Sequence, residues 1–387
     1  MNIEKRYPSV ADMETTARKR IPGFLWDYLS GGLGNGANVQ RNRQALNDIL
    51  LMPRYLAAAD TPEIRCRLLG QTYDAPFGVA PLGLSGLVWP RSEYILAAAA
   101  KTHNIPYTLS TVATASLESI APVAGANAWF QLYPPNDPVV EKSLLDRCHA
   151  AGYGTILLTV DVPVNTRREH DIRNGLAVPP RFDLRTLYQM VTHPGWSLRM
   201  LTAGVPQFVN IKPYYAGAQS GNTGQSIRAS VQFISQVMKG HITAERFARI
   251  RDGWPGKLLV KGVLSVEDAT QYMALGADGL VISNHGGRQL DAAPSPVQVL
   301  PAIRRAVGPD VPLLADSGAR SGLDVARLLA LGADFVLMGR PFLFALGALD
   351  KPGGAHVMAV LKAELRAALG QLGCPTLSEL PKFLYDR

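Results

Sequence analysis

The sequence predicts an α/β fold in which eight strands close into a (β/α)8 TIM barrel. From residue 77 onward, short apolar runs alternate with amphipathic stretches of helical periodicity. Each run carries apolar residues on both faces, as in the buried strands of a parallel sheet. An open doubly wound sheet is the alternative, but "APLGLSGL" (80–87) lacks the GxGxxG pattern that usually follows its first strand. A closed parallel barrel is therefore the expected fold.

Length and composition fit one such barrel with additional elements. The chain has 387 residues, 47% of them hydrophobic. We expect a single domain (1–387) made of four parts. These are an N-terminal helical segment (1–75), the barrel (76–350), a long insertion after the fourth barrel strand (181–242) and C-terminal helices (351–387).

Charge and cysteine content narrow the function. The net charge of +8 comes without a basic run or a zinc-binding spacing, so neither nucleic acid nor a metal is an expected ligand. A basic enzyme that handles anions, or that rests on an acidic membrane surface, fits better. Cys66, Cys148 and Cys374 lie far apart in the sequence, which indicates a reducing, cytoplasmic location. We expect no signal peptide and no membrane span.

The elements follow in order along the chain. Ser9 followed by Asp12 resembles a helix start, and Pro22 limits that helix. The rest of the first segment is expected to be helical and then irregular. The eight expected barrel strands are 77–81, 107–110, 128–132, 155–160, 257–262, 279–283, 312–316 and 335–339.

The segment 181–242 interrupts this alternation and contains no clear strand. Long segments of this kind in a compact domain are usually functional or disordered. Its first half, 181–215, suits a surface that touches anionic lipid. A lid or a subunit contact is the alternative. The apolar and basic residues that carry the membrane hypothesis are Leu184, Leu187, Met190, Trp196, Leu198 and Met200 with Arg181, Arg185 and Arg199.

Polar residues follow the apolar strands at six consecutive positions of the barrel. Active sites of such barrels lie at the carboxyl ends of the strands. One polar residue there is commonly a cap or a turn, but a series of six indicates a site. The residues are Gln131 and Tyr133, Thr159 and Asp161, Lys261, Ser283 and His285, Asp316, and Gly339 with Arg340.

The last two strand ends resemble a phosphate site. "DSGARSG" (316–322) and "GRP" (339–341) each lead into a helix, and small residues there let backbone N–H groups approach an anion. Arg320 and Arg340 add positive charge. Either motif alone is as readily an ordinary turn, whereas the pair favours a phosphorylated cofactor.

His285 is the candidate general base. A single histidine is more often structural, but this one follows a buried strand and precedes Gly286 and Gly287, which let a ligand approach. Asp161 would fix its tautomer, and Arg288 offers a planar fork to a carboxylate. Together these features describe the oxidation of a small acid on a nucleotide cofactor.

At this point the sequence resembles the FMN-dependent 2-hydroxy acid dehydrogenases and oxidases, over nearly its whole length. "SNHGGRQLD" (283–291), with "LLVKG" (258–262) upstream and "ADSGARSG" (315–322) downstream, is highly specific. "DYLSGG" (27–32), "WFQLY" (129–133) and "TVDVPVNTRREHD" (159–171) agree with it. "GLVWP" (86–90), "HPGWSL" (193–198) and "LGCPTLSEL" (372–380) are most similar to the bacterial mandelate dehydrogenase branch, followed by bacterial L-lactate dehydrogenase.

The resemblance implies a role for each matching residue. His285 is the base with Asp161 as its partner, and Tyr133 lies near the reacting oxygen. Arg168, Arg288 and the Tyr28 hydroxyl bind the substrate carboxylate, and Lys261 lies at the N1–O2 edge of the flavin. The implied FMN contacts are Pro81, Leu82, Gly83, Ser110, Gln131, Thr159, Lys261 and Ser283, with Asp316, Ser317, Gly318, Ala319, Arg320, Gly339 and Arg340 at the phosphate.

The implied reaction converts a small L-2-hydroxy acid, lactate- or mandelate-like, to the 2-oxo acid. His285 takes either the α-proton or the hydroxyl proton, and the electrons pass to quinone or another acceptor. An oxidase that uses oxygen and releases hydrogen peroxide is the alternative. A flavin-binding scaffold without catalysis is a third hypothesis, which the complete set of site residues opposes. The resemblance also implies a homotetramer and a position on the inner face of the cell membrane.

Two positions depart from the family pattern. Val112 stands where glycolate oxidase-like members carry a tryptophan, which leaves room for a longer or aromatic substrate. "DSGARS" (316–321) replaces the commoner "DGGVRR". Because Ser317 keeps that turn small, we expect FMN binding to be retained.

Overall fold

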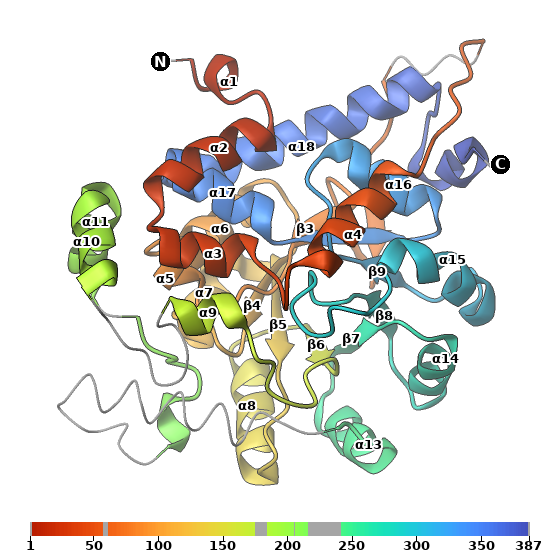
Figure 1. The fold of residues 1–387 in the computed structure, drawn as a ribbon. Coiled ribbons are helices and arrows are strands. Elements are labelled where there is room, and N and C mark those ends of the chain that lie inside the picture. Colours follow the sequence, from red (N-terminus) through yellow and green to blue (C-terminus); the bar gives the residue numbers. More distant parts are fainter. Residues whose placement is uncertain (1, 57–60, 175–183, 205, 216–240, 386–387) are drawn as a thin grey trace.

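The computed structural model describes residues 2–56, 61–174, 184–204, 206–215 and 241–385. Its centre is a closed barrel of eight parallel strands in the order β10-β3-β4-β5-β6-β7-β8-β9, which confirms the predicted fold (Figure 1). Each strand falls on one of the expected apolar runs. The strands are β3 Phe77–Val79, β4 Tyr107–Ser110, β5 Ala128–Leu132, β6 Thr155–Thr159, β7 Lys257–Val263, β8 Gly279–Ile282, β9 Leu313–Ala315 and β10 Phe335–Met338.

Both faces of the barrel strands are buried, which is why apolar residues occur on both faces of each strand. Leu157, Leu259, Val281 and Leu314 fill the interior, while their chain neighbours pack outward against the helices. The helices alternate with the strands in the expected way (Figure 1). They are α5 Ser85–Val88, α6 Ser92–Thr102, α7 Leu117–Ala124, α8 Pro138–Ala150, α13 Ala244–Gly253, α14 Val266–Ala274, α15 Pro296–Val307, α16 Gly322–Ala330, α17 Arg340–Leu349 and α18 Lys351–Leu372, with 3-10 turns η1 Gly125–Asn127 and η3 Leu377–Phe383.

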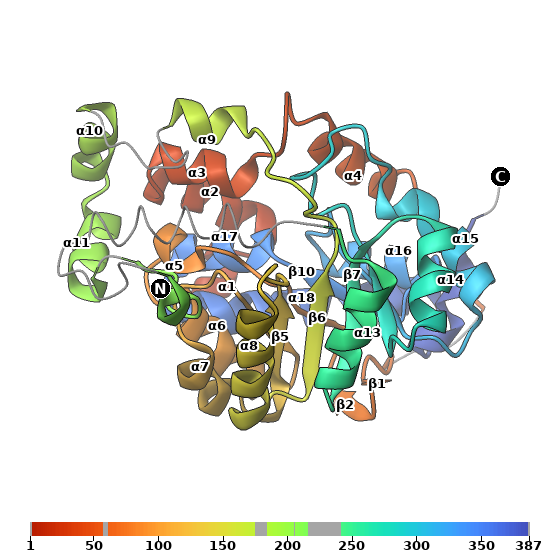
Figure 2. The same cartoon turned by 90° about the horizontal axis from the view of Figure 1, so that it is seen from below.

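A short hairpin before the barrel was not predicted. Strands β1 Cys66–Leu68 and β2 Gln71–Tyr73 pair antiparallel, and Figure 2 shows them, in orange, at the side of the barrel opposite α3 and α9. Leu68 and Tyr73 join the interior cluster, and the Tyr73 ring lies 6.3 Å from that of Trp129 and 5.9 Å from that of Phe335. The hairpin therefore closes the amino-terminal end of the barrel.

The N-terminal segment is helical, as expected. It forms α1 Ile3–Arg6, α2 Val10–Arg20, α3 Gly23–Ser30 and α4 Ala37–Asn47. Ser9 and Asp12 make the predicted start of α2 as a full capping box. Helix α2 packs closely on α17, where a Cβ at Gly347 would lie 2.9 Å from the Cβ of Ala17. This N-terminal segment, called the N-terminal arm below, therefore packs against the last third of the chain.

Helix α9 Glu169–Arg173 precedes the insertion and packs against α3. The insertion contributes two helices at one edge of the molecule, α10 Leu184–Thr192 and α11 Pro194–Ala203 (Figures 1 and 2). On α10, Leu184, Leu187, Tyr188 and Val191 are exposed at helical spacing. On α11, Leu198 and Leu201 are exposed. Among the described residues, no helix is both long and apolar enough to cross a membrane.

Part of the predicted lipid-facing set is wrong. Met190 and Met200 are partly buried and pack against the hydrophobic core. Trp196 is buried, and its ring meets Phe24 edge-on at 6.2 Å. Arg199 forms an ion pair of 2.5 Å with Asp350. Both residues attach α11 to the barrel because their side chains are on the inner side of that helix. Arg181 lies outside the described residues.

The end of the described insertion returns to the barrel mouth. The 3-10 turn η2 spans Lys212–Tyr214. On either side of it, Phe208, Ile211 and Tyr215 are buried together. Tyr133 and Val112 pack against them. The insertion therefore covers one side of the predicted site with apolar side chains.

Candidate active site

His285 lies between an acid and a phenol. It follows β8 in a left-handed turn with φ +60°. Its Nδ1 is 2.9 Å from Asp161 Oδ1, and its Nε2 is 3.2 Å from the Tyr133 hydroxyl. A carboxylate at Nδ1 holds the proton on that nitrogen and leaves Nε2 as the proton acceptor. The arrangement is that of a base with its orienting acid.

Electrostatics keep this pair in the form that a base requires. Burial lowers the pKa of His285, although the Asp161 carboxylate acts in the opposite direction. Burial raises the pKa of Asp161, but the charges of His285 and Lys261 outweigh it and the net pKa lies below its ordinary value. Near neutral pH, His285 is neutral and Asp161 is ionised.

Gly262 makes room for the Asp161 carboxylate. Its φ is +108°, and a Cβ there would lie 2.6 Å from both Cβ and Cγ of Asp161. The register of β7 against β8 shifts between Lys261 and Val263, so the glycine forms a bulge in the strand. Sequence reasoning missed this residue, although a glycine inside an apolar strand signals a bulge or a close approach.

Lys261 is the buried cation at the centre of the mouth. Its Nζ donates to Ser283 Oγ at 3.0 Å and lies 3.2 Å from Asp316 Oδ2. Burial lowers the pKa of this amine, yet Asp316 and Asp161 outweigh burial and raise it. Lys261 is therefore a fixed positive charge.

A chain of neutral polar groups crosses the ends of β4, β5 and β6. Ser110 Oγ donates to Gln131 Oε1 at 2.8 Å, and Gln131 Nε2 donates to Thr159 Oγ1 at 2.8 Å. Donors and acceptors in one row beside a lysine fit the polar edge of an isoalloxazine ring. The predicted neighbours Pro81, Leu82 and Gly83 follow β3. A Cβ at Gly83 would lie 2.8 Å from the Val112 side chain.

The two arginines predicted to bind the substrate carboxylate lie near α3. The Arg288 guanidinium donates to the Tyr28 carbonyl at 2.7 Å and lies 4.7 Å from the centre of the Tyr28 ring. The Tyr28 hydroxyl donates to the Gly83 carbonyl at 3.1 Å. Arg168 precedes α9 and lies 3.8 Å from Asp171. Burial, then the charge of Arg168, lowers the pKa of Arg288, so these two cations share one site.

Positive charge also gathers at the predicted phosphate site. Burial, then the charge of Arg43, lowers the pKa of Arg320 to about 10. The pKa of Arg340 falls well below its ordinary value through burial and then through Arg320 and Arg288. Arg340 donates to three carbonyls, those of Leu29, Gly31 and Gly286. Clustered buried cations favour a bound anion, which fits the phosphate of FMN.

Three asparagines attach the turn after β8 to the N-terminal arm. The Asn284 amide hydrogen-bonds Asn38 and Asn42 of α4 at 2.7 to 2.9 Å, with all three side chains buried. The sequence "SNHGG" showed the asparagine, but its partners lie more than two hundred residues earlier. No local pattern indicates such a contact.

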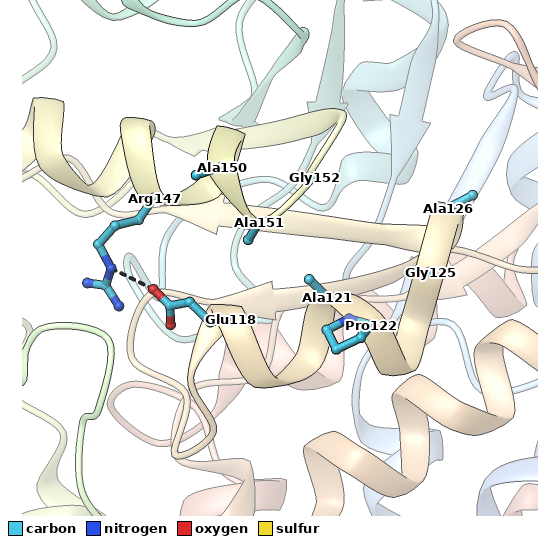
Figure 3. A pocket seen from close by; sticks show the side chains of 9 residues that line it. All are labelled: Glu118, Ala121, Pro122, Gly125, Ala126, Arg147, Ala150, Ala151 and Gly152. Carbon is cyan, nitrogen blue, oxygen red and sulfur yellow. Dashed lines mark hydrogen bonds and ion pairs between the residues drawn. The ribbon is translucent and has the colours of Figure 1, made fainter.

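A hollow on the outer surface lies away from these residues. It is between α7 and α8, and Figure 3 shows Arg147 donating across it to Glu118 at 2.8 Å. Arg147 also donates to the Asn210 carbonyl at 2.8 Å, which fastens the insertion to α8. None of the predicted site residues lines this hollow.

Comparisons with known proteins agree with the geometry of the mouth. Residues 17–386 match the family of FMN-dependent dehydrogenases. The (S)-mandelate dehydrogenase of Pseudomonas putida is 37% identical over 379 residues, which cover 98% of this chain and 94% of that protein. An L-lactate dehydrogenase of Pseudomonas entomophila (strain L48) is 37% identical over 371 residues, 96% of each chain.

Solved structures similar to this chain include members of the same enzyme family. A monotopic membrane protein, (S)-mandelate dehydrogenase, superposes with a TM-score of 0.91 at 36% identity, covering 98% of this chain and 99% of that one. A mandelate oxidase superposes with a TM-score of 0.80 at 32% identity and 98% coverage of both chains. The chain belongs to the family of FMN-dependent 2-hydroxy acid dehydrogenases, and FMN is its cofactor.

Proposed function

We propose that the protein oxidises a small L-2-hydroxy acid, lactate- or mandelate-like, to the 2-oxo acid with His285 as the general base. The observation that carries this proposal is the position of His285, with Nδ1 on Asp161 and Nε2 beside Tyr133. Hydroxy acid oxidation removes two protons and two electrons from the substrate. The bound flavin accepts the electrons, and the protein must supply the base.

Each neighbouring side chain has a proposed task. His285 takes a proton from the substrate, either from C2 or from its hydroxyl, and the ionised Asp161 then stabilises the imidazolium. Arg288 and Arg168 hold the substrate carboxylate with the Tyr28 hydroxyl, which fixes C2 against the base. Tyr133 hydrogen-bonds the reacting oxygen.

The same proposal assigns the cofactor contacts. Ser110, Gln131, Thr159 and Ser283 would face the polar edge of the ring, and Lys261 would stabilise negative charge on it. Pro81, Leu82 and Gly83 would lie along the ring. The phosphate would be bound by the backbone and side chains of 316–320 together with Gly339 and Arg340.

The side chain of the substrate would meet an apolar wall. Val112, Phe208 and Tyr215 pack together next to Tyr133. Such a wall accommodates aliphatic or aromatic 2-hydroxy acids.

We further propose that α10 and α11 rest on the membrane and that quinone accepts the electrons. The exposed stripe of Leu184, Leu187, Tyr188 and Val191 supports this, with Arg185 on the same helix. One structural relative is described as a monotopic membrane protein. We also propose a homotetramer, which light scattering on the purified holoprotein would test.

An oxygen-using oxidase is the second candidate, because a mandelate oxidase is among the structural relatives. Reduced enzyme would be mixed with air-saturated buffer or with a quinone analogue. Fast transfer to quinone and slow reoxidation by oxygen are expected of a dehydrogenase. The reverse order of rates would establish the oxidase.

Anaerobic bleaching of the flavin tests the main proposal. The yellow holoprotein would be mixed with L-lactate, S-mandelate, glycolate and longer 2-hydroxy acids. We expect at least one to bleach the flavin. The His285→Asn variant should keep FMN and lose about 10²- to 10⁴-fold in the reduction rate. A His285→Asn protein with near-normal turnover would refute the role of the base.

A further inference from the structure

Ser317 has an unusual backbone for a residue with a side chain. Its φ is +71°, in the left-handed region that favours glycine, and the residue is buried. His285 also has a left-handed φ, and Gly286 and Gly287 continue the same conformation. We call residues 283–287 the His285 turn. The steric cost at Ser317 requires compensation from its contacts.

The Ser317 hydroxyl supplies that compensation through three hydrogen bonds. It donates to Asp316 Oδ1 at 2.6 Å. It accepts from the backbone N–H of Gly286 at 2.9 Å and of Asn284 at 3.3 Å. These two amides belong to the residues on either side of His285, so one oxygen holds the His285 turn from both sides.

A second serine completes a ring of contacts. Ser283 Oγ accepts from the His285 N–H and from Lys261 Nζ, each at 3.0 Å. Lys261 in turn lies 3.2 Å from Asp316 Oδ2. The flavin-edge cation is therefore joined to the backbone of His285 by two routes, one through Ser283 and one through Asp316 and Ser317.

We infer that Ser317 is a positioning residue whose hydroxyl fixes the His285 turn and couples it to the Asp316–Lys261 pair. This inference rests on the proposed role of His285 as the base. It extends the expectation that Ser317 merely keeps a phosphate-binding turn small. A glycine at this position would leave Asp316 Oδ1 without this donor and the amides of Asn284 and Gly286 without this acceptor.

Loss of the hydroxyl should affect the chemical step more than substrate binding. Without an acceptor for two amides, the His285 turn shifts and the His285–Asp161 contact loosens. A small misplacement of a catalytic group lowers the rate steeply. Arg288 keeps its own bond to the Tyr28 carbonyl, so the substrate affinity should change little.

The pH dependence should move as well. The charged and titratable groups that face His285 come from six elements. They are Asp161 after β6, Lys261 on β7, Tyr133 after β5, Arg168 before α9, and Arg288 and Arg340 after β8 and β10. None of these is removed by a change at 317. Burial is the largest cause that lowers the pKa of His285, so a looser, more hydrated turn should raise that pKa.

The test compares Ser317→Gly with Ser317→Ala, both as holoenzymes. Glycine removes the hydroxyl and the left-handed strain, whereas alanine removes only the hydroxyl. We expect both to keep FMN and to lose about 10-fold or more in kcat, with KM within about 3-fold of the wild type. The acid limb of kcat/KM should move to higher pH in both, and the glycine variant should melt at the higher temperature.

Arg91→Gly is the matched control, because Arg91 is exposed and left-handed at φ +63° and contacts none of the site residues. It should leave kcat and the pH profile unchanged. A Ser317→Gly enzyme with wild-type kcat and pH profile overturns the inference, as does a loss of rate fully restored by added FMN. If His285→Asn remains active, the proposed function fails instead, whatever the Ser317 variants do.

Discussion

Arg288 and Arg340 donate to the same backbone oxygen, the carbonyl of Leu29, at 3.4 and 2.8 Å. Both also reach the Gly31 carbonyl, at 3.5 and 2.7 Å. Leu29 lies in the last turn of α3 and Gly31 is its cap, where unpaired carbonyls form the negative end of the helix dipole. The end of one short helix therefore orients an arginine of the proposed substrate site and an arginine of the proposed phosphate site.

Arg288→Lys should weaken substrate binding while it preserves the charge. A single ammonium cannot bond both the α3 carbonyls and a substrate carboxylate as a planar guanidinium can. One charge-assisted hydrogen bond contributes about 1.5–3 kcal/mol, so we expect the substrate Kd to rise about 10- to 100-fold. Stopped-flow flavin reduction at several substrate concentrations measures it. Arg65→Lys, at an exposed ion pair with Glu63, is the control. A substrate Kd in the Arg288 variant equal to that of the wild type would contradict the proposed contact between Arg288 and the substrate carboxylate.

The acid limb of kcat/KM should lie below pH 6.5 in the wild type, because burial lowers the pKa of His285 from that value. Asp161 acts in the opposite direction, so Asp161→Asn should move the limb to still lower pH and reduce kcat by about 10²- to 10⁴-fold. A limb that moves to higher pH would show that Asp161 does not interact with His285 as described.

The same pKa shift predicts how stability depends on pH. The unfolded chain binds the proton of His285 more readily than the folded protein does. The contribution of His285 to the free energy of unfolding should therefore decrease as the pH falls through 6.5. Denaturant melts of the wild type and His285→Asn at several pH values isolate this contribution, which the variant should lack.

Gly262→Ala should impair catalysis by displacing Asp161, although His285 itself remains. The added Cβ would displace the Asp161 carboxylate, with which it would overlap at 2.6 Å, and would strain a φ of +108°. We expect kcat to fall about 10²-fold while FMN stays bound. Gly152→Ala, at φ +87° with open space around it, reproduces the backbone strain alone. Equal activities of the two variants would exclude a specific role for Gly262.

Leu187→Glu with Val191→Glu should abolish binding to vesicles that contain anionic lipid. These side chains are 56% and 70% exposed on α10, so the change should leave the fold intact. Burial of each apolar side chain in the bilayer surface would contribute about 1.5–3 kcal/mol. Co-sedimentation measures the binding. Val139→Glu, 76% exposed on α8, is the control; unchanged sedimentation of the α10 variant would refute the membrane surface.

The barrel strands were predictable because burial on both faces places apolar residues on both sides of each strand. The hairpin of β1 and β2 was not predictable in this way. Its strands have three residues each, of which Leu68 and Tyr73 are buried in the interior and Cys66 packs partly buried against them. Three residues are too few to show a period of two. Leu69 and Gly70 do mark its turn, both with positive φ.

The candidate site could be predicted from side-chain chemistry, whereas the backbone contacts within it could not be predicted from the sequence. His285, Asp161 and Lys261 were predicted from residue type and position, and the structure places them together. The carbonyls of Leu29 and Gly31 have no signature, because every residue carries one. In the insertion, the exposure of Leu184, Leu187 and Leu198 agrees with the prediction. The inward positions of Trp196 and Arg199 depend on tertiary contacts.

The N-terminal arm is synthesised first, but the elements on which it packs are synthesised late. Helix α2 packs on α17, and Asn38 and Asn42 of α4 bond Asn284. During synthesis these helices leave the ribosome long before residues 284 to 349 exist. Their apolar residues, such as Met13 and Ala17, lack their final packing partners until nearly the whole barrel has been translated. The arginines that α3 orients are consequently among the last parts of the site to be set in place.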